Sequence, residues 1–406
     1  MALSVTASLL FALITAYSLI SLLTTTLPPN TKPPPPTPSQ PPLTLSPSHT
    51  FKLALFSDLH YGEQESSWGI DQDANSTRLL HHILSAENPD LAVLNGDLIT
   101  GENTFRHNSS AYVHRIVAPM VDTQTPWAST YGNHDSKANL RREDMLRVER
   151  GYGALSYTRT TAGLEGITNY YLLIYRPGRR KGRPVGVLWF FDSRGGGSYG
   201  GGSGPADEED DIPNWVGPGT ARWFRDEASA LRARYGGVLL PSVAFVHIPP
   251  TVFLAAQRRG IDPALFPGVN EDVPVAAQGT GREDGGFVDV LREERIRGGL
   301  HSVFVGHDHG NAWCALWPGD GEDETGGRGP FLCFGRHTGY GGYGDWTRGS
   351  RIVRLRFGDE KGDGSADEME VETWVRMEGG QVVTRVMLNQ TYGRDRYPTA
   401  NGEFHE

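Results

Sequence analysis

Residues 53–60 read Leu-Ala-Leu-Phe-Ser-Asp-Leu-His, a short apolar run followed at once by Asp58 and His60. Short apolar runs of this kind are typical of buried strands. Polar residues that follow such a strand lie beyond its carboxyl end, where open α/β sheets hold their ligands. We therefore expect Asp58 and His60 at one edge of a sheet.

The same arrangement recurs four times along the chain. The apolar runs 91–94, 127–131, 243–246 and 303–305 end in the motifs Gly96-Asp97, Gly132-Asn133-His134-Asp135, His247 and Gly306-His307-Asp308-His309. A single Gly-Asp is commonly a turn, and a single His after a strand is commonly a structural polar residue. Five such motifs in series instead favour one site that collects Asp, Asn and His side chains at the same sheet edge.

These side chains form a donor set for a pair of metal ions. Carboxylate and amide oxygens combined with imidazole suit iron, zinc or manganese, whereas a structural zinc site would need thiolates. None of the five motifs contains cysteine. The sequence therefore predicts two divalent or trivalent metal ions, drawn from Fe, Zn and Mn.

The ordered motifs resemble the calcineurin-like metallophosphoesterase superfamily, whose pattern is D-x-H, G-D, G-N-H-D/E, H and G-H-x-H. The resemblance covers residues 51–356, and the stretches 56–61, 215–231 and 246–249 are most similar to a fungal and plant branch close to purple-acid-phosphatase-29-like proteins. Members of that branch often carry the label "inactive". His60 stands where the purple enzymes have Gly, and Thr100 stands where their metal-bound Tyr would be, so we expect no tyrosinate-to-iron colour.

The resemblance implies a role for each motif residue. Asp97 can bridge the two metals, because a shared carboxylate holds such ions about 3.5–4 Å apart. Asp58, His60 and His309 would complete the first site, and Asn133, His247 and His307 the second. His134 would protonate the leaving oxygen, with Asp135 orienting its ring. His337 and Tyr340, in the Gly-rich stretch 335–344, are expected to line the substrate pocket, although a purely structural role is the alternative.

The implied reaction is dinuclear-metal-dependent hydrolysis of phosphomonoesters by metal-bound hydroxide, which would make the chain a phosphatase. The substrate would be a phosphorylated small molecule or a phosphoprotein. Two alternatives stay open: hydrolysis of phosphodiesters or nucleotides at the same centre, and a secreted binding protein that retains the fold without turnover. The formal net charge of −10, with no long basic stretch, argues against a nucleic-acid scaffold.

Helical periodicity alternates with the apolar runs. Apolar residues recur at helical spacing within 79–84, 113–120 and 223–231, and Asn75 or Ser76 could cap the first helix. Further strands are expected at 185–191, 352–357, 369–375 and 382–388. This alternation predicts an α/β fold with two packed mixed sheets flanked by helices, and the resemblance implies the same architecture, a four-layer αββα sandwich. The domain is expected to span 49–394, with a tail at 395–406.

The amino-terminal region is expected to lie outside the fold. Residues 2–27 carry no charge and include a long apolar stretch, as in a signal peptide or a signal anchor. Residues 28–48 are rich in proline and predict an extended linker. The chain is therefore expected in the secretory pathway, either extracellular or vacuolar, or anchored to a membrane through residues 1–27.

Two further features agree with that route. Asn75, Asn108 and Asn389 each lie in an Asn-x-Ser/Thr glycosylation acceptor. Cys314 and Cys333 are the only cysteines, and both lie in short apolar segments that flank a loop. In an oxidising compartment we expect them to form one disulfide, with two separate buried thiols as the alternative.

Overall fold

The computed structural model describes residues 40–105, 108–135, 140–178, 182–197, 212–281, 283–319, 329–359 and 368–398. The predicted targeting segment 1–27 lies outside these residues. Within the described ranges, none of the helices has the length and apolar character needed to cross a bilayer.

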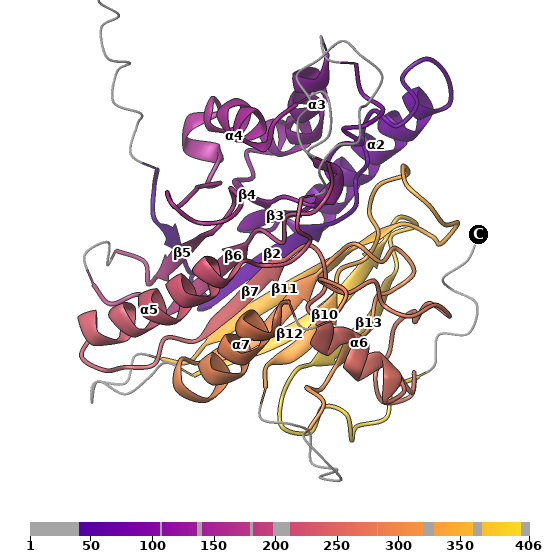
Figure 1. Cartoon of the computed structure of the whole chain (residues 1–406). Coiled ribbons are helices and arrows are strands. Elements are labelled where there is room, and N and C mark those ends of the chain that lie inside the picture. The colour runs from indigo at the N-terminus through magenta and orange to yellow at the C-terminus, as the bar shows by residue number, and fades with distance from the viewer. Residues whose placement is uncertain are drawn as a thin grey trace, which may run out of the picture. The chain divides into compact units, whose positions relative to one another are not determined.

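Two mixed sheets form the centre of the domain (Figure 1). The seven-stranded sheet has the order β1-β5-β6-β7-β8-β10-β9 and the six-stranded sheet the order β13-β12-β11-β2-β3-β4. The strands of the first are Leu43–Thr44 (β1), Tyr170–Tyr175 (β5), Gly186–Phe191 (β6), Ser242–Val246 (β7), Leu300–Val305 (β8), Cys314–Ala315 (β9) and Phe331–Phe334 (β10). Those of the second are Thr50–Phe56 (β2), Leu91–Asn95 (β3), Trp127–Thr130 (β4), Gly349–Phe357 (β11), Met369–Met377 (β12) and Val382–Met387 (β13).

Alternation along the strands builds three apolar layers. Leu53 and Leu55 of β2 face the seven-stranded sheet and pack with Phe190 and Phe245 between the two sheets. The intervening Ala54 packs with the helices on the outer face. The strand β2 is therefore apolar on both faces and is covered on both sides.

Helices cover the two outer faces (Figure 1). The six-stranded sheet packs with Gly69–Glu87 (α2), Ser109–Asp122 (α3) and Arg142–Arg150 (α4), and the seven-stranded sheet with Pro218–Arg234 (α5), Thr251–Arg258 (α6) and Gly285–Arg297 (α7). The predicted αββα arrangement is confirmed.

Parallel pairing aligns the strand ends that carry the motifs. Phe56 pairs with Leu94 and Asn95 with Thr130 in the six-stranded sheet. Phe191 pairs with Val246 in the seven-stranded sheet, where β7 and β8 are also parallel. The residues that follow β2, β3, β4, β7 and β8 therefore leave the sheets at the same edge.

Three boundaries differ from expectation. The domain begins before residue 49, because Leu43 in β1 pairs with Ile174 in β5, so part of the expected linker 28–48 is a strand. The helix α2 begins at Gly69 without a side-chain cap, so Asn75 and Ser76 lie inside it. The expected tail at 395–406 begins too early, because the Tyr397 N–H donates to the Ala264 carbonyl at 2.8 Å.

Cys314 and Cys333 lie opposite each other on β9 and β10 and form a disulfide, as expected. Both are buried. The bond joins the edge strand of the seven-stranded sheet to its neighbour.

Candidate metal centre

Four of the motif residues occupy strained turns after their strands. Asp58, His60, Asp97 and His307 have φ angles of 58°, 48°, 51° and 77°. Side-chain-bearing residues rarely adopt this left-handed region, and such strain gathers at functional sites. Gly96 precedes Asp97 with a φ of 85°, and a Cβ on it would lie 2.3 Å from the His247 ring. The glycine of this motif is therefore required by close packing as well as by the turn.

One group of side chains, which we call the first site, consists of Asp58, His60 and His309. Their potential ligand atoms all lie within 4.8 Å of one another. The Nε2 atoms of His60 and His309 are 3.2 Å apart, and the Asp58 Oδ1 atom is 3.7 Å from the His309 Nε2 atom. Two imidazole nitrogens that converge beside a carboxylate are a geometry that suits a cation.

A second group, which we call the second site, consists of Asp97, His247 and His307 under the same criterion. The Asp97 Oδ2 atom is 2.9 Å from the His247 Nε2 atom and 3.8 Å from the His60 Nε2 atom of the first site. Asp97 therefore lies between the two groups, where a bridging carboxylate would have to be.

Hydrogen bonds fix which ring nitrogen faces the cluster in His247 and His309. The Nδ1 atoms of His247 and His309 donate to the carbonyls of Asn95 and Tyr343, each at 2.8 Å. Since a carbonyl can only accept, Nε2 of each ring keeps a free lone pair for a metal. His60 Nδ1 lies 3.2 Å from the hydroxyl of Thr100, which therefore supports this histidine.

Asn133 supplies an independent test of whether a metal fits. It follows β4 on the short helix Asn133–Asp135 (η1). Its Oδ1 atom is buried and has no hydrogen-bond partner among the described residues. A buried amide oxygen without a partner is costly, and a cation beside it would satisfy it. The donor set therefore fits a pair of metal ions.

Burial and mutual charge shift the pKa values across the cluster. Burial raises the pKa of Asp58 to about 7, and the Asp97 carboxylate adds to that rise. Although burial opposes the change, His247 and His134 hold the pKa of Asp97 well below its usual range. Burial lowers the pKa of His60 to about 4 and that of His307 to about 3. The pKa of His247 moves the other way: although burial opposes the change, the Asp97 carboxylate raises it to about 9, so metal binding there would displace a proton.

His134 lies at the rim of the cluster with a carboxylate of its own. Its Nδ1 atom is 2.6 Å from the Glu102 Oε1 atom, and its backbone N–H donates to the Asp97 Oδ1 atom at 2.8 Å. Burial alone would lower the pKa of His134, but the charges of Asp97 and Glu102 raise it to about 9. Its side chain is one-third exposed, so it can reach a substrate.

The expectation that Asp135 orients the His134 ring is wrong. Asp135 is fully buried, and its carboxylate accepts the backbone N–H groups of Leu98, Ile99 and Gly132. It therefore ties the Gly-Asp turn to the Gly-Asn-His-Asp turn, while Glu102 holds the ring. Glu102 carries no signal in the sequence, because it reaches His134 only through the turn that bonds the Gly101 N–H to the His134 carbonyl.

The two expected pocket residues are engaged elsewhere. His337 is buried and donates from Nε2 to the Gly341 carbonyl. Its ring packs against the His309 ring at a centroid distance of 3.9 Å, tilted by 36°. The Tyr340 hydroxyl pairs with Glu378, and its backbone N–H donates to Ser76 in α2. His337 therefore supports the candidate ligand His309 on the side away from the cluster. Tyr340 anchors the Gly-rich stretch 335–344.

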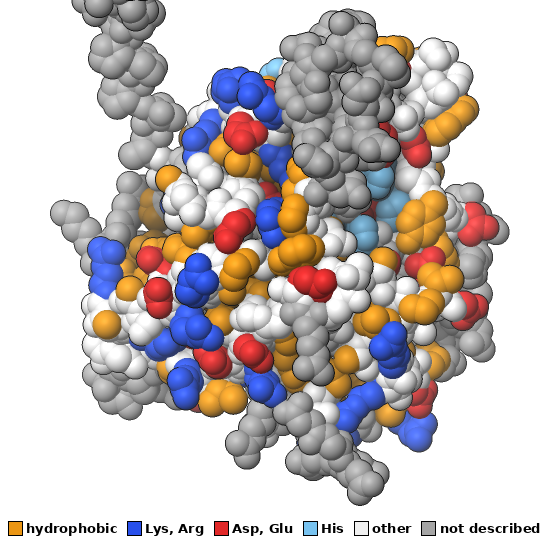
Figure 2. All heavy atoms as spheres, in the orientation of Figure 1, with side chains coloured by type: hydrophobic (Ala, Val, Ile, Leu, Met, Phe, Trp, Pro, Cys, Tyr) orange, Lys and Arg blue, Asp and Glu red, His pale blue; other side chains and the backbone are white. Residues whose placement is uncertain are grey.

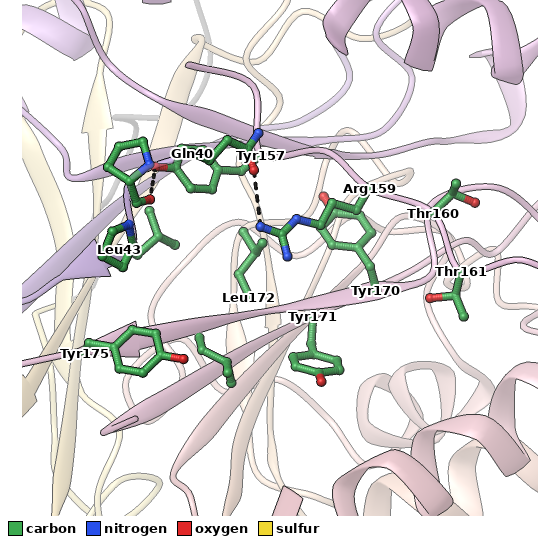
Figure 3. A pocket seen from close by; sticks show the side chains of 13 residues that line it. Gln40, Leu43, Tyr157, Arg159, Thr160, Thr161, Tyr170, Tyr171, Leu172 and Tyr175 are labelled. Atoms are coloured by element: carbon green, nitrogen blue, oxygen red, sulfur yellow. Dashed lines mark hydrogen bonds between the residues drawn. The ribbon is translucent and has the colours of Figure 1, made fainter. Parts of the chain in front are cut away.

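A separate pocket of about 380 Å³ lies beside β1 and β5 (Figure 3). Its lining includes Tyr157, whose hydroxyl donates to Pro41, and Tyr171, whose hydroxyl donates to Glu227. None of the five motifs contributes to it. By contrast, histidine side chains reach the surface on the face seen in Figure 2.

A family model identifies the family to which the chain belongs. The model of the calcineurin-like phosphoesterases matches residues 51–311. A protein of Arabidopsis thaliana named probable inactive purple acid phosphatase 29 is 26% identical over 369 residues, which are 85% of this chain and 87% of that protein. Phosphatase DCR2 of Saccharomyces cerevisiae is 25% identical and is matched over 81% of this chain and 54% of its own length. A solved dimetal phosphatase from Danio rerio shows a TM-score of 0.49 at 13% identity, covering 84% of this chain and 99% of its own.

Proposed function

Since the chain belongs to the calcineurin-like phosphoesterase family, we propose that it is a phosphatase that hydrolyses phosphomonoesters at a dinuclear metal centre. One observation carries the proposal: Asp97 lies between two complete groups of donors, within 3.8 Å of a histidine in each. Asp58, His60 and His309 would hold one ion, and Asn133, His247 and His307 the other, with Asp97 shared. The donor types suit Fe, Zn or Mn.

Bound metals would activate a water molecule and neutralise phosphate oxygens, which is the chemistry such pairs supply. The protein's own contribution starts with rigid placement, because the histidine rings are held by Asn95, Thr100 and Tyr343. His134 then supplies a proton to the leaving oxygen. Glu102 keeps that imidazole charged and oriented, and thus holds the proton at Nε2 until the ester bond breaks.

The disulfide supports the proposed route through the secretory pathway. Cys314 and Cys333 are paired and buried, and disulfides of this kind persist in oxidising compartments. We infer a secreted, vacuolar or anchored phosphatase that acts on phosphorylated small molecules or phosphoproteins.

The proposal is tested by metal analysis and turnover on one set of proteins. Wild type should hold close to two transition-metal ions per chain and hydrolyse an aryl phosphate, and chelation should abolish that activity. Asp97→Asn should lose both ions, because its carboxylate serves both groups. Asp226→Asn, an exposed change on α5, is the matched control and should retain both.

Each other outcome would reject a specific part of the proposed function. Two bound ions without turnover on monoesters, diesters or phosphopeptides would favour the non-catalytic binding protein, as the name of the Arabidopsis relative suggests. Preferential cleavage of diesters would favour the phosphodiesterase alternative. Full metal occupancy in Asp97→Asn would reject the bridging role.

A further inference from the structure

The loop 339–346, between β10 and β11, packs directly on the histidines of the first site. A Cβ on Gly342, whose φ is 75°, would lie 2.3 Å from the His309 Cε1 atom and 2.9 Å from the His60 Cδ2 atom. The Gly342 N–H donates to the Glu63 carboxylate at 2.8 Å, which ties the loop to the segment that follows His60. Only glycine permits so close an approach at this φ.

Tyr343 holds His309 in three ways at once. Its carbonyl accepts the His309 Nδ1–H at 2.8 Å, its hydroxyl accepts the His309 backbone N–H at 3.0 Å, and its ring stacks on the imidazole with centroids 4.1 Å apart and an interplanar angle of 11°. These contacts fix the tautomer, the rotation and the tilt of the ring. The His337 ring packs against the same imidazole, tilted by 36° at a centroid distance of 3.9 Å.

The second site has no comparable dependence on this loop. The Nδ1 atom of His247 donates to the carbonyl of Asn95, the last residue of the buried strand β3. That support comes from the sheet itself. His309, by contrast, follows β8 within the Gly306–His309 turn and takes its support from a loop whose Tyr343 is half exposed.

From this asymmetry we infer that Tyr343 is a positioning residue that sets the metal affinity of the first site and leaves the second site unaffected. The inference rests on the metal centre of the proposed function and adds that the two sites differ in how they are held. Mutation of a residue that orients a ligating histidine typically weakens metal binding about 10- to 100-fold. Both substitutions keep the backbone carbonyl that accepts the His309 Nδ1–H. Tyr343→Ala removes the stacking and the hydroxyl acceptor, whereas Tyr343→Phe removes only the hydroxyl.

The experiment titrates the zinc-loaded full-length protein with a chelator and counts the ions retained. Tyr343→Ala should release one ion at a chelator concentration about 10- to 100-fold lower than wild type requires, and hold the other normally. Tyr343→Phe should show a smaller shift in the same ion. Tyr171→Phe removes a hydroxyl that donates to Glu227, away from the five motifs, so it is the matched control and should match wild type.

A variant that lacks a ligand of the second site identifies which ion is lost. In His307→Ala only the first site keeps its three donors, so adding Tyr343→Ala should remove the remaining ion at the lower chelator concentration. Thermal unfolding of the metal-free proteins verifies that each variant is folded. Two ions retained with wild-type affinity in Tyr343→Ala, or equal weakening of both ions, would overturn the inference. A wild type that binds no metal would instead reject the proposed function.

Discussion

Two carboxylates hold His134, one at its backbone and one at its ring. Asp97 binds its backbone N–H and Glu102 binds its ring, so the position of the imidazole is fixed at both ends. A protonated imidazole at the rim of a metal cluster is suited to donate its proton to a leaving oxygen. The Glu102–His134 pair therefore predicts general-acid catalysis by His134, which kinetics can test.

Removing this imidazole should slow hydrolysis in a way that depends on the leaving group. We expect His134→Ala to retain both metals and to lose roughly 10²- to 10⁴-fold in kcat, the usual contribution of a general acid. Alkyl phosphates should suffer more than nitrophenyl phosphate, because nitrophenolate leaves without protonation. Glu102→Gln should show the same dependence with a smaller loss. Equal losses on both substrates at matched metal content would assign His134 to phosphate binding instead.

The sequence identified the cluster residues because each follows a buried strand directly. Asp58, Asp97 and His247 need only the strand and its direction to be placed. Glu102 and Tyr343 could not be found in this way, since their roles arise where loops fold back across the sheet edge. Asp135 was assigned to the wrong partner for the same reason, because its three N–H donors lie on turns that only the fold brings together.

At the scale of elements, α2 shows where local signals fail. Asn75 and Ser76 are typical capping residues, but Asn75 accepts a hydrogen bond from Arg78 and Ser76 accepts the Tyr340 N–H. The helix instead begins at Gly69, packed against the Gln64 backbone. Likewise, the proline-rich composition around Leu43 hid a strand that exists only because β5 offers a partner. Tertiary contacts outweigh local preference at both places.

Asp73 in α2 provides a test of stability against pH. It is buried, accepts the Gly62 N–H at 3.1 Å, and burial raises its pKa to about 6 from 3.8. The folded state therefore binds this proton more tightly than the unfolded state. The resulting stabilisation is complete below about pH 4 and is lost as the pH rises through about 6.

The variant Asp73→Asn keeps an oxygen that can accept the Gly62 N–H but has no group that titrates. Urea unfolding should find the variant and wild type equally stable near pH 4, and the variant more stable by about 2–3 kcal/mol at pH 8, at about 1.4 kcal/mol per pKa unit. Asp71→Asn, an exposed change in the same helix, should show no such trend. A variant that is less stable at pH 8 would mean that the ion pair between Asp73 and Arg115 outweighs the cost of burial.

Across the whole domain, both candidate sites draw on both sheets. Asp58 and Asp97 follow strands of the six-stranded sheet, and His247, His307 and His309 follow strands of the seven-stranded sheet. Bound metals would therefore join the two sheets at their common edge. Each sheet alone offers an incomplete donor set.

Metal removal should accordingly destabilise the folded state as well as stop catalysis. A ligand present at about a thousand times its Kd stabilises by about 4 kcal/mol per site, so chelation should lower the Tm by several degrees. Differential scanning calorimetry with and without EDTA measures the shift. Asp97→Asn should show little response to EDTA, and an equal response in both proteins would assign the effect to another site.

The three glycosylation acceptors differ in their surroundings, which orders their expected use. Asn389 is exposed in a turn after β13, whereas Asn75 lies within α2 and the Asn108 Oδ1 atom is buried. Expressed in a eukaryotic secretory host, the chain should shift in mass on glycosidase treatment, and Asn389→Gln should remove most of that shift. Mass spectrometry of the deglycosylated peptides decides it. An unglycosylated product with reduced Cys314 and Cys333 would contradict the proposed route.

The strand order of the six-stranded sheet also determines when each strand can find its partners during synthesis. β2, which leads into Asp58 and His60, lies between β3, which the ribosome makes next, and β11, which it makes near the end. Until β11 emerges, one edge of β2 has no partner, and unpaired strand edges invite aggregation. A stop codon after residue 348 would spare every residue of the candidate centre and yet release a chain with that edge exposed. The strand β11 therefore covers the free edge of β2 only late in synthesis. Until then, we expect the nascent chain to be prone to aggregation at that edge.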